Sequence, residues 1–90
     1  DYMISKLNAI YADVKLELVK TSGDSIFLKI RKSTYLTQQM GSTGAEAYLA
    51  EVTYNLTEVK DINFVDISFK KGDHASPGTY SRTDFVHEKN

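Results

Sequence analysis

The sequence predicts a small α+β domain in which two helices cover one face of a three-stranded mixed sheet. Three observations lead to this class. Apolar residues recur at helical spacing in two segments, one near the N-terminus and one between residues 44 and 60. In three other segments they alternate with polar residues, as in half-buried strands. The order along the chain is αββαβ, which fits a two-layer sandwich around one core.

The first segment is predicted to be a short helix over residues 1–13. Ile4, Leu7 and Ile10 recur at helical spacing and would lie on one face. Asp1 is a candidate N-cap, because an aspartate at this position accepts hydrogen bonds from free N–H groups of the first turn.

Residues 14–20 and 26–30 are predicted to form a β-hairpin joined by a turn that contains glycine. The pattern of the first strand also fits a helix in part. Val14 and Leu18 also continue the helical stripe of the preceding segment, whereas Leu16 fits only the strand. Leu16 therefore decides for a strand.

The longest helix is predicted over residues 44–60, after a loop over residues 33–41. Thr43 and Glu46 have the spacing of a capping box at its start. One face is apolar and is expected to be buried against the sheet; it consists of Ala45, Tyr48, Leu49, Val52, Leu56 and Val59. The other face is expected to meet water or a partner; it carries Glu46, Glu51, Tyr54 and Glu58.

A third strand is predicted over residues 62–69. It carries apolar residues on both faces, which indicates a central place in the sheet. If it runs parallel to the preceding strand, the helical crossover between them should be right-handed. Residues 72–90 turn polar and are expected to form a loop or tail, from which Phe85 and Val86 are candidates to pack back on the domain.

The length, the cysteine content and the charge of the chain exclude or disfavour several classes of function. The 90 residues fit a single domain over 1–90. The absence of cysteine excludes disulfides, thiolate metal sites and a cysteine nucleophile. With 11 basic and 12 acidic residues, the chain has no basic excess for nucleic acid. Lys70-Lys71 is a block of two like charges and does not amount to a membrane-surface stripe. Membrane association is therefore expected only through an anchor outside this chain.

No catalytic motif is visible, and we expect no enzyme activity, cofactor or metal. His74 and His87 are too few for a metal site with defined spacing. The alternative is a small ligand-binding or hydrolytic domain that uses the loop over residues 72–82. That loop contains residue types found in hydrolytic sites, namely Asp73, His74, Ser76 and Arg82. Three of them are almost adjacent in the sequence, whereas the groups of a hydrolytic site are held in place by a rigid scaffold.

Aromatic residues outside the predicted core suggest an interaction surface instead, because interfaces are enriched in them. The candidate residues are Tyr35, Tyr54, Tyr80 and Arg82. We expect a protein partner that the sequence does not identify, and allow for a weak homo-oligomer through the open edges of the sheet.

One stretch is similar to a known family. In residues 40–59, glycine and serine lead into a helix that ends in Tyr54-Asn55-Leu56-Thr57-Glu58-Val59. A strand follows that reads Val59-Lys60-Asp61-Ile62-Asn63-Phe64-Val65-Asp66-Ile67-Ser68-Phe69-Lys70-Lys71-Gly72. This pattern resembles the sporulation and spore germination (GerMN) domain, and the similarity extends over about residues 14–82.

The resemblance implies an extracytoplasmic, non-catalytic interaction module of a bacterial cell-envelope lipoprotein, associated with sporulation or germination and anchored to the membrane outside this chain. It also implies a fold similar to the ring-building motif of sporulation channel proteins. It supplies no catalytic or cofactor-binding residues.

Overall fold

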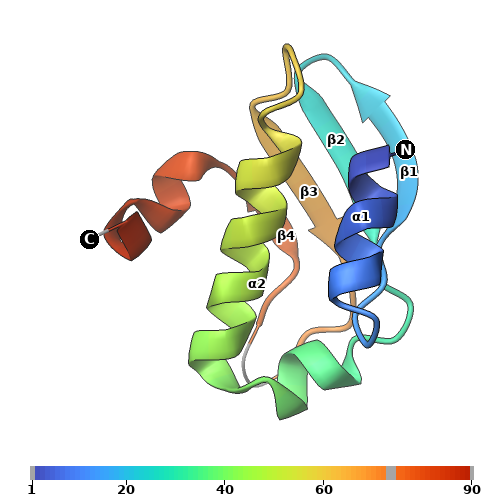
Figure 1. Ribbon diagram of the computed structural model, residues 1–90, viewed down its shortest axis with the longest axis vertical. Coiled ribbons are helices and arrows are strands. Elements are labelled where there is room, and N and C mark those ends of the chain that lie inside the picture. The colour runs from blue at the N-terminus through green and yellow to red at the C-terminus, as the bar shows by residue number, and fades with distance from the viewer. Residues whose placement is uncertain (1, 73–74, 90) are drawn as a thin grey trace.

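The computed structural model describes residues 2–72 and 75–89, and its α+β class confirms the sequence prediction (Figure 1). The elements are, in order, α1 (Tyr2–Ile10), β1 (Glu17–Ser22), β2 (Ser25–Lys29), the π-helical turn η1 (Tyr35–Gln39), α2 (Gly41–Leu56), β3 (Phe64–Ser68), β4 (Gly78–Tyr80) and the 3₁₀ segment η2 (Arg82–Lys89).

The sheet has four strands in the order β1-β2-β3-β4, so the prediction of three strands was wrong. β2 is antiparallel to β1 and parallel to β3, and β4 is antiparallel to β3. β4 lies in the segment predicted to be a loop or tail. Its three residues are too few and too polar to give an alternating pattern, and they are extended because they pair with the existing edge of β3. The central position of β3 is confirmed.

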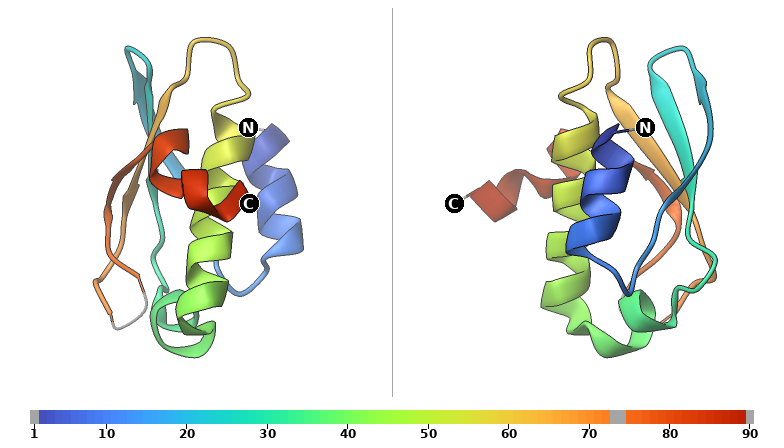
Figure 2. Two further views of the ribbon diagram at one scale, coloured as in Figure 1. Left: turned by 90° about the vertical axis from the view of Figure 1, so that its left-hand side faces the viewer. Right: turned by 45° about the vertical axis from the view of Figure 1, so that its right-hand side comes forward.

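Both α-helices lie on the same face of the sheet, and the other face is left open by the helices (Figure 2). β2 and β3 are parallel and are joined through α2. In Figure 1 both strands run downward, α2 lies in front of them and β3 is to the left of β2, which is the expected right-handed crossover.

The core lies between the two layers. Five of the six residues predicted for the buried face of α2 are buried, but Val59 is 42% exposed because the helix ends at Leu56. Fully or nearly fully buried side chains come from both layers: Val14, Leu28, Leu36, Tyr48, Val52, Thr53, Leu56, Val65 and Ile67. Phe85 is buried, as predicted; the side chain of Val86 lies outside the described residues.

The start of α2 differs from the prediction. The helix begins at Gly41, and its N-cap Met40 has no side-chain cap, so Thr43 and Glu46 lie inside the helix and form no capping box. The reason is η1, which replaces the predicted loop and leads directly into α2. The Met40 N–H already bonds to the Tyr35 carbonyl at 2.9 Å, and Gly41 has a φ of 76° that re-aims the chain.

The N-terminal boundaries also shift. α1 ends at Ile10, and β1 begins only at Glu17, so buried Val14 and Leu16 precede the strand. The Asn8 amide joins the two segments: its Nδ2 donates to the Leu16 carbonyl at 3.0 Å, and the Leu16 N–H donates to Oδ1 at 2.7 Å. This side chain satisfies both peptide groups of Leu16 as a neighbouring strand would.

Candidate functional site

Arg82 and Tyr54, two of the predicted surface residues, contact each other at the C-terminal end of α2. The Arg82 guanidinium carbon lies 5.2 Å from the centre of the Tyr54 ring, and Nη2 donates to the Tyr54 carbonyl at 3.1 Å. The Tyr54 hydroxyl donates back to the Arg82 carbonyl at 3.5 Å. Tyr54 is half-buried against the core rather than fully exposed.

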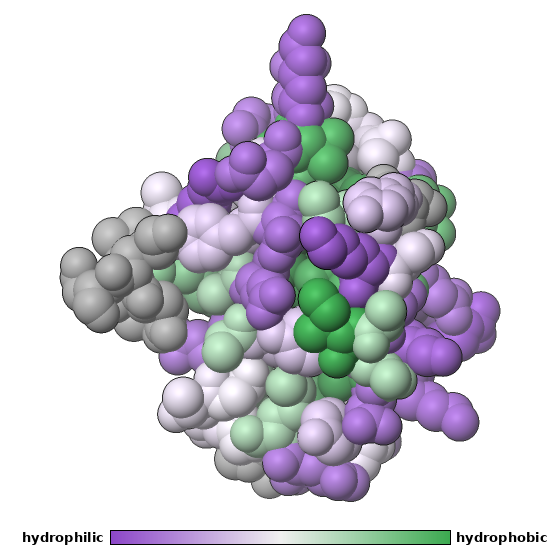
Figure 3. All heavy atoms as spheres, viewed as in Figure 1, coloured by the Kyte–Doolittle hydropathy of each residue, from purple (hydrophilic) through white to green (hydrophobic). Residues whose placement is uncertain are grey.

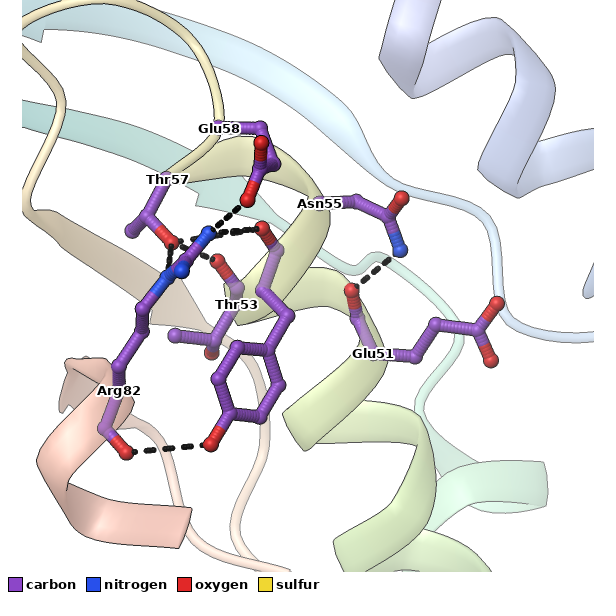
Figure 4. Close-up of polar contacts among 7 residues, drawn as sticks. Glu51, Thr53, Asn55, Thr57, Glu58 and Arg82 are labelled. Atoms are coloured by element: carbon purple, nitrogen blue, oxygen red, sulfur yellow. Dashed lines mark hydrogen bonds and ion pairs between the residues drawn. The ribbon is translucent and has the colours of Figure 1, made fainter. Parts of the chain in front are cut away.

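The Arg82 guanidinium also binds side chains at the C-terminal end of α2. Arg82 Nε donates to Thr57 Oγ1 at 2.7 Å, and Thr57 Oγ1 donates to the Thr53 carbonyl at 2.7 Å (Figure 4). Arg82 Nη2 also forms an ion pair with Glu58. A cation at a helix C-terminus interacts favourably with the helix dipole. Arg82 therefore fastens the C-terminal segment to α2, and this contact is internal to the fold.

Tyr80 is also engaged within the domain. Its ring stacks on Phe85 with a centroid distance of 5.7 Å, and its hydroxyl donates to the Ser76 carbonyl. Burial, and secondarily the nearby Asp84 carboxylate, raises the pKa of Tyr80 above its ordinary value. An open depression of about 500 Å³ lies beside this pair, with Glu46 and Asp84 in its wall.

The loop over residues 72–82 shows no assembled hydrolytic site in its described part. Arg82 turns toward α2, while the Ser76 carbonyl accepts the Tyr80 hydroxyl. Asp73, His74 and the His87 side chain lie outside the described residues. Among the residues that are described, no group of three or more His, Cys, Asp or Glu side chains is placed to hold a metal ion.

Tyr35 lies apart from the other three predicted surface residues. It is 39% exposed on η1, which precedes α2, whereas Arg82 contacts the last turn of that helix. The 16 residues of α2 separate the two by about 24 Å of helix. The four predicted residues therefore do not form one continuous surface.

Tyr35 instead adjoins a group of basic residues that sequence reasoning missed. Because β2 and β3 are parallel and in register, with Lys29 opposite Ser68, the residues after both strands leave the same end of the sheet. The Ser33 hydroxyl donates to the Lys70 carbonyl at 3.2 Å across this end. β1 starts beside the end of β2 and so adds a further lysine. We call the resulting group the basic end; it consists of Lys15, Arg31, Lys32, Lys70 and Lys71.

The outer edge of β1 is a second exposed feature. Among the described strands, β1 pairs with β2 alone, and all six of its residues are exposed. Leu18 and Val19 are 47% and 58% exposed and stand next to each other at a β-bulge. Glu17 forms an ion pair with Arg31, and the Lys20 ammonium lies 5.1 Å from the centre of the Phe27 ring.

A tyrosine pair connects the helical layer. The Tyr11 and Tyr48 rings meet edge to face at 4.8 Å, and the Tyr48 hydroxyl donates to the Val14 carbonyl at 3.1 Å. The Tyr11 hydroxyl donates to the Glu51 carboxylate, and this hydrogen bond, with burial, raises the pKa of Tyr11 to about 12. Burial raises the pKa of Tyr48 far above its ordinary value. These contacts fix α1 and its following turn to α2.

No family model, curated protein or solved structure matches this chain. Within the described residues, no helix combines the length and the apolar character that a bilayer span requires.

Proposed function

We propose that this chain is a non-catalytic protein–protein interaction domain that assembles with a second copy of itself through the outer edge of β1. The observation that carries the proposal is this edge: six exposed residues whose outward N–H and C=O groups face no other strand of the described chain. An unpaired edge strand is a template for pairing with another chain. Leu18 and Val19 add exposed apolar side chains at its centre.

The charge pattern of β1 suits an antiparallel pair of identical strands. Glu17 and Lys20 are opposite Lys29 and Phe27, which are two residues apart on β2. The bulge therefore puts Glu17 and Lys20 on the same, open face of the sheet, although three positions separate them along β1. A two-fold axis between Leu18 and Val19 would set Glu17 of each copy beside Lys20 of the other.

The cellular setting of the proposal is supported by the resemblance of residues 14–82 to the GerMN domain. On this basis we place the domain in a bacterial cell envelope, outside the cytoplasm, in a membrane-anchored protein associated with sporulation or germination. The upstream part of the gene is the test: a signal peptide with a lipobox cysteine supports this setting, and fusion to a cytoplasmic enzyme contradicts it.

The alternative of a ligand-binding or hydrolytic domain has less support. It depends on the loop over residues 72–82, where Ser76 and Arg82 are engaged in contacts within the fold. Soaking with divalent metals, sulfate or sugars while following the His74 resonance would test it, and a shift of that resonance would favour this alternative.

A charge-exchange experiment tests assembly through β1. Sedimentation equilibrium at increasing concentration should show a weak dimer for the unchanged chain. Glu17→Lys gives an edge with two basic residues, and Lys20→Glu gives an edge with two acidic residues. Each variant alone should be monomeric, because like charges oppose each other across antiparallel strands. An equimolar mixture of the two should form the dimer again.

The equimolar mixture distinguishes pairing of the β1 edges from a general effect of net charge on association. Lys60→Glu, which changes the same charge away from β1, should leave the dimer intact. A strictly monomeric unchanged chain at high concentration excludes the second copy as partner. A dimer that survives in both single variants places the interface elsewhere.

A further inference from the structure

We propose that the basic end docks on the surface of an anionic phospholipid bilayer. The proposal does not depend on pairing of the β1 edge, although Glu17 borders both surfaces. Four basic side chains line two depressions at this end together with the carboxylates of Asp13 and Glu17; they are Lys15, Arg31, Lys32 and Lys70. Lys71 follows Lys70 in the chain, so that among the described residues of this end basic groups outnumber acidic ones by three, in a chain whose net charge is −1. The basic residues come from three segments of the chain, and the sheet brings these segments together.

Most of these charges are not used by the fold. Arg31 pairs with Glu17, but Lys15, Lys32, Lys70 and Lys71 form no ion pair with any described residue. All four are exposed. Lysine is depleted at protein interfaces, where arginine is preferred, whereas an anionic membrane surface attracts any accessible basic residue. A group made mainly of free lysines therefore fits a lipid headgroup layer better than a protein partner.

Apolar side chains lie directly beside the lysines. Tyr35 lines a depression of about 410 Å³ together with Arg31, Lys32 and Lys70. It also lines a neighbouring, smaller depression together with Ile10 and Met40. Figure 3 shows hydrophilic side chains projecting at the lower right of the molecule, with apolar side chains beside them.

Tyr35 and Ile10 are 39% and 57% exposed, so both are free to enter the interfacial region while the lysines reach the phosphates. Tyrosine is enriched at this depth of a bilayer, where its ring is buried and its hydroxyl stays hydrated.

The fold holds this end rigid. Gly72 packs so closely against η1 that a Cβ at this position would lie 2.3 Å from the Thr37 Cβ. The Thr37 hydroxyl donates to the Ser33 carbonyl at 3.0 Å, and the Ser33 hydroxyl donates to the Lys70 carbonyl. The backbone segments that carry Lys32 and Lys70 are therefore tied together at this end.

Vesicle co-sedimentation tests the proposal. The full chain should bind vesicles of phosphatidylglycerol and phosphatidylcholine but not vesicles of phosphatidylcholine alone. Binding should weaken steeply with salt, since the screening length shrinks from about 10 Å at 0.1 M to about 3 Å at 1 M. Lys70→Gln with Lys71→Gln should weaken binding roughly 30-fold, because each basic residue near an anionic surface contributes about fivefold.

A matched control removes the same charge elsewhere. Lys6→Gln with Lys60→Gln should change binding by less than about twofold, because neither lysine belongs to the basic end. Circular dichroism establishes that both double variants are folded.

The chain contains no tryptophan, so Tyr35→Trp supplies a single fluorophore at the proposed contact. Its emission should shift to shorter wavelength on anionic vesicles, and that of Phe64→Trp on β3 should not.

Three results would overturn the proposal. The first is equal binding to neutral vesicles. The second is equal loss in the control variant. The third is absence of vesicle binding while the resonances of Lys70 and Lys71 respond to inorganic phosphate, to polyglutamate or to an oligonucleotide, which would assign the basic end to a soluble anion, an acidic protein or a nucleic acid.

Discussion

Replacing Thr53 by valine should stabilise the domain, although it removes a polar group from a helix. Thr53 is fully buried in α2, and its Oγ1 has no hydrogen-bond partner among the described residues. A buried hydroxyl without a partner costs about 1–3 kcal/mol. Valine has nearly the same shape, replaces the hydroxyl with a methyl group and has a similar helix propensity. We therefore expect Thr53→Val to add about 1 kcal/mol to the free energy of unfolding.

Thermal unfolding followed by circular dichroism measures this change. For a domain of this size, about 1 kcal/mol corresponds to a rise in Tm of roughly 4–8 °C. Thr53→Ser is the matched control, because it keeps the hydroxyl and removes only the methyl group; it should lower stability by about 1 kcal/mol. If Thr53→Val lowers the Tm as much as Thr53→Ser does, the Thr53 hydroxyl has a hydrogen-bond partner in solution, which contradicts the predicted stabilisation.

Two further predictions follow from α2 and its contacts. Leu56→Ala should lower the free energy of unfolding by about 2–5 kcal/mol, because it leaves a cavity in the core. Tyr54→Ala should lower it by about 1–2 kcal/mol, more than a purely exposed site, because it removes a half-buried ring and the Arg82 contact. Urea titration of both variants checks this order, and the reverse order would mean that the helix is rotated. Since the fold raises the pKa of Tyr11 from 10.0 to about 12, its contribution to stability is complete below pH 10 and is lost as the pH rises from 10 to 12. Tyr11→Phe should flatten the decline of unfolding free energy across that window, and an unchanged slope would contradict the role of the Glu51 hydrogen bond.

Periodicity predicted the elements whose faces are buried against the helical layer. β2 was placed correctly because Ile26, Leu28 and Ile30 alternate and all three are buried. The apolar face of α2 was predicted for the same reason. Its ends were not, because η1 supplies the turn before Gly41 and the chain leaves the helix after Leu56.

Features made by contacts between distant segments were not predictable in this way. β4 carries no alternating pattern of its own and is a strand because β3 offers it an edge. The basic end requires knowing that β2 and β3 are parallel and in register, after which the pairs Arg31-Lys32 and Lys70-Lys71 would have indicated it. The signal was present in the sequence, since both pairs follow closely on the predicted strands.

The position of β4 has a consequence for the chain as it leaves the ribosome. β3 contributes two fully buried apolar residues, Val65 and Ile67, and β4 is the only described strand on its second side. Until residue 80 has been synthesised, the second side of β3 has no described strand to pair with, and an unpaired edge is a template for pairing with another chain. Arg82, two residues after β4, then fastens the segment to α2. β4 therefore covers an edge that would otherwise be open to other chains, although it is the shortest strand of the described sheet.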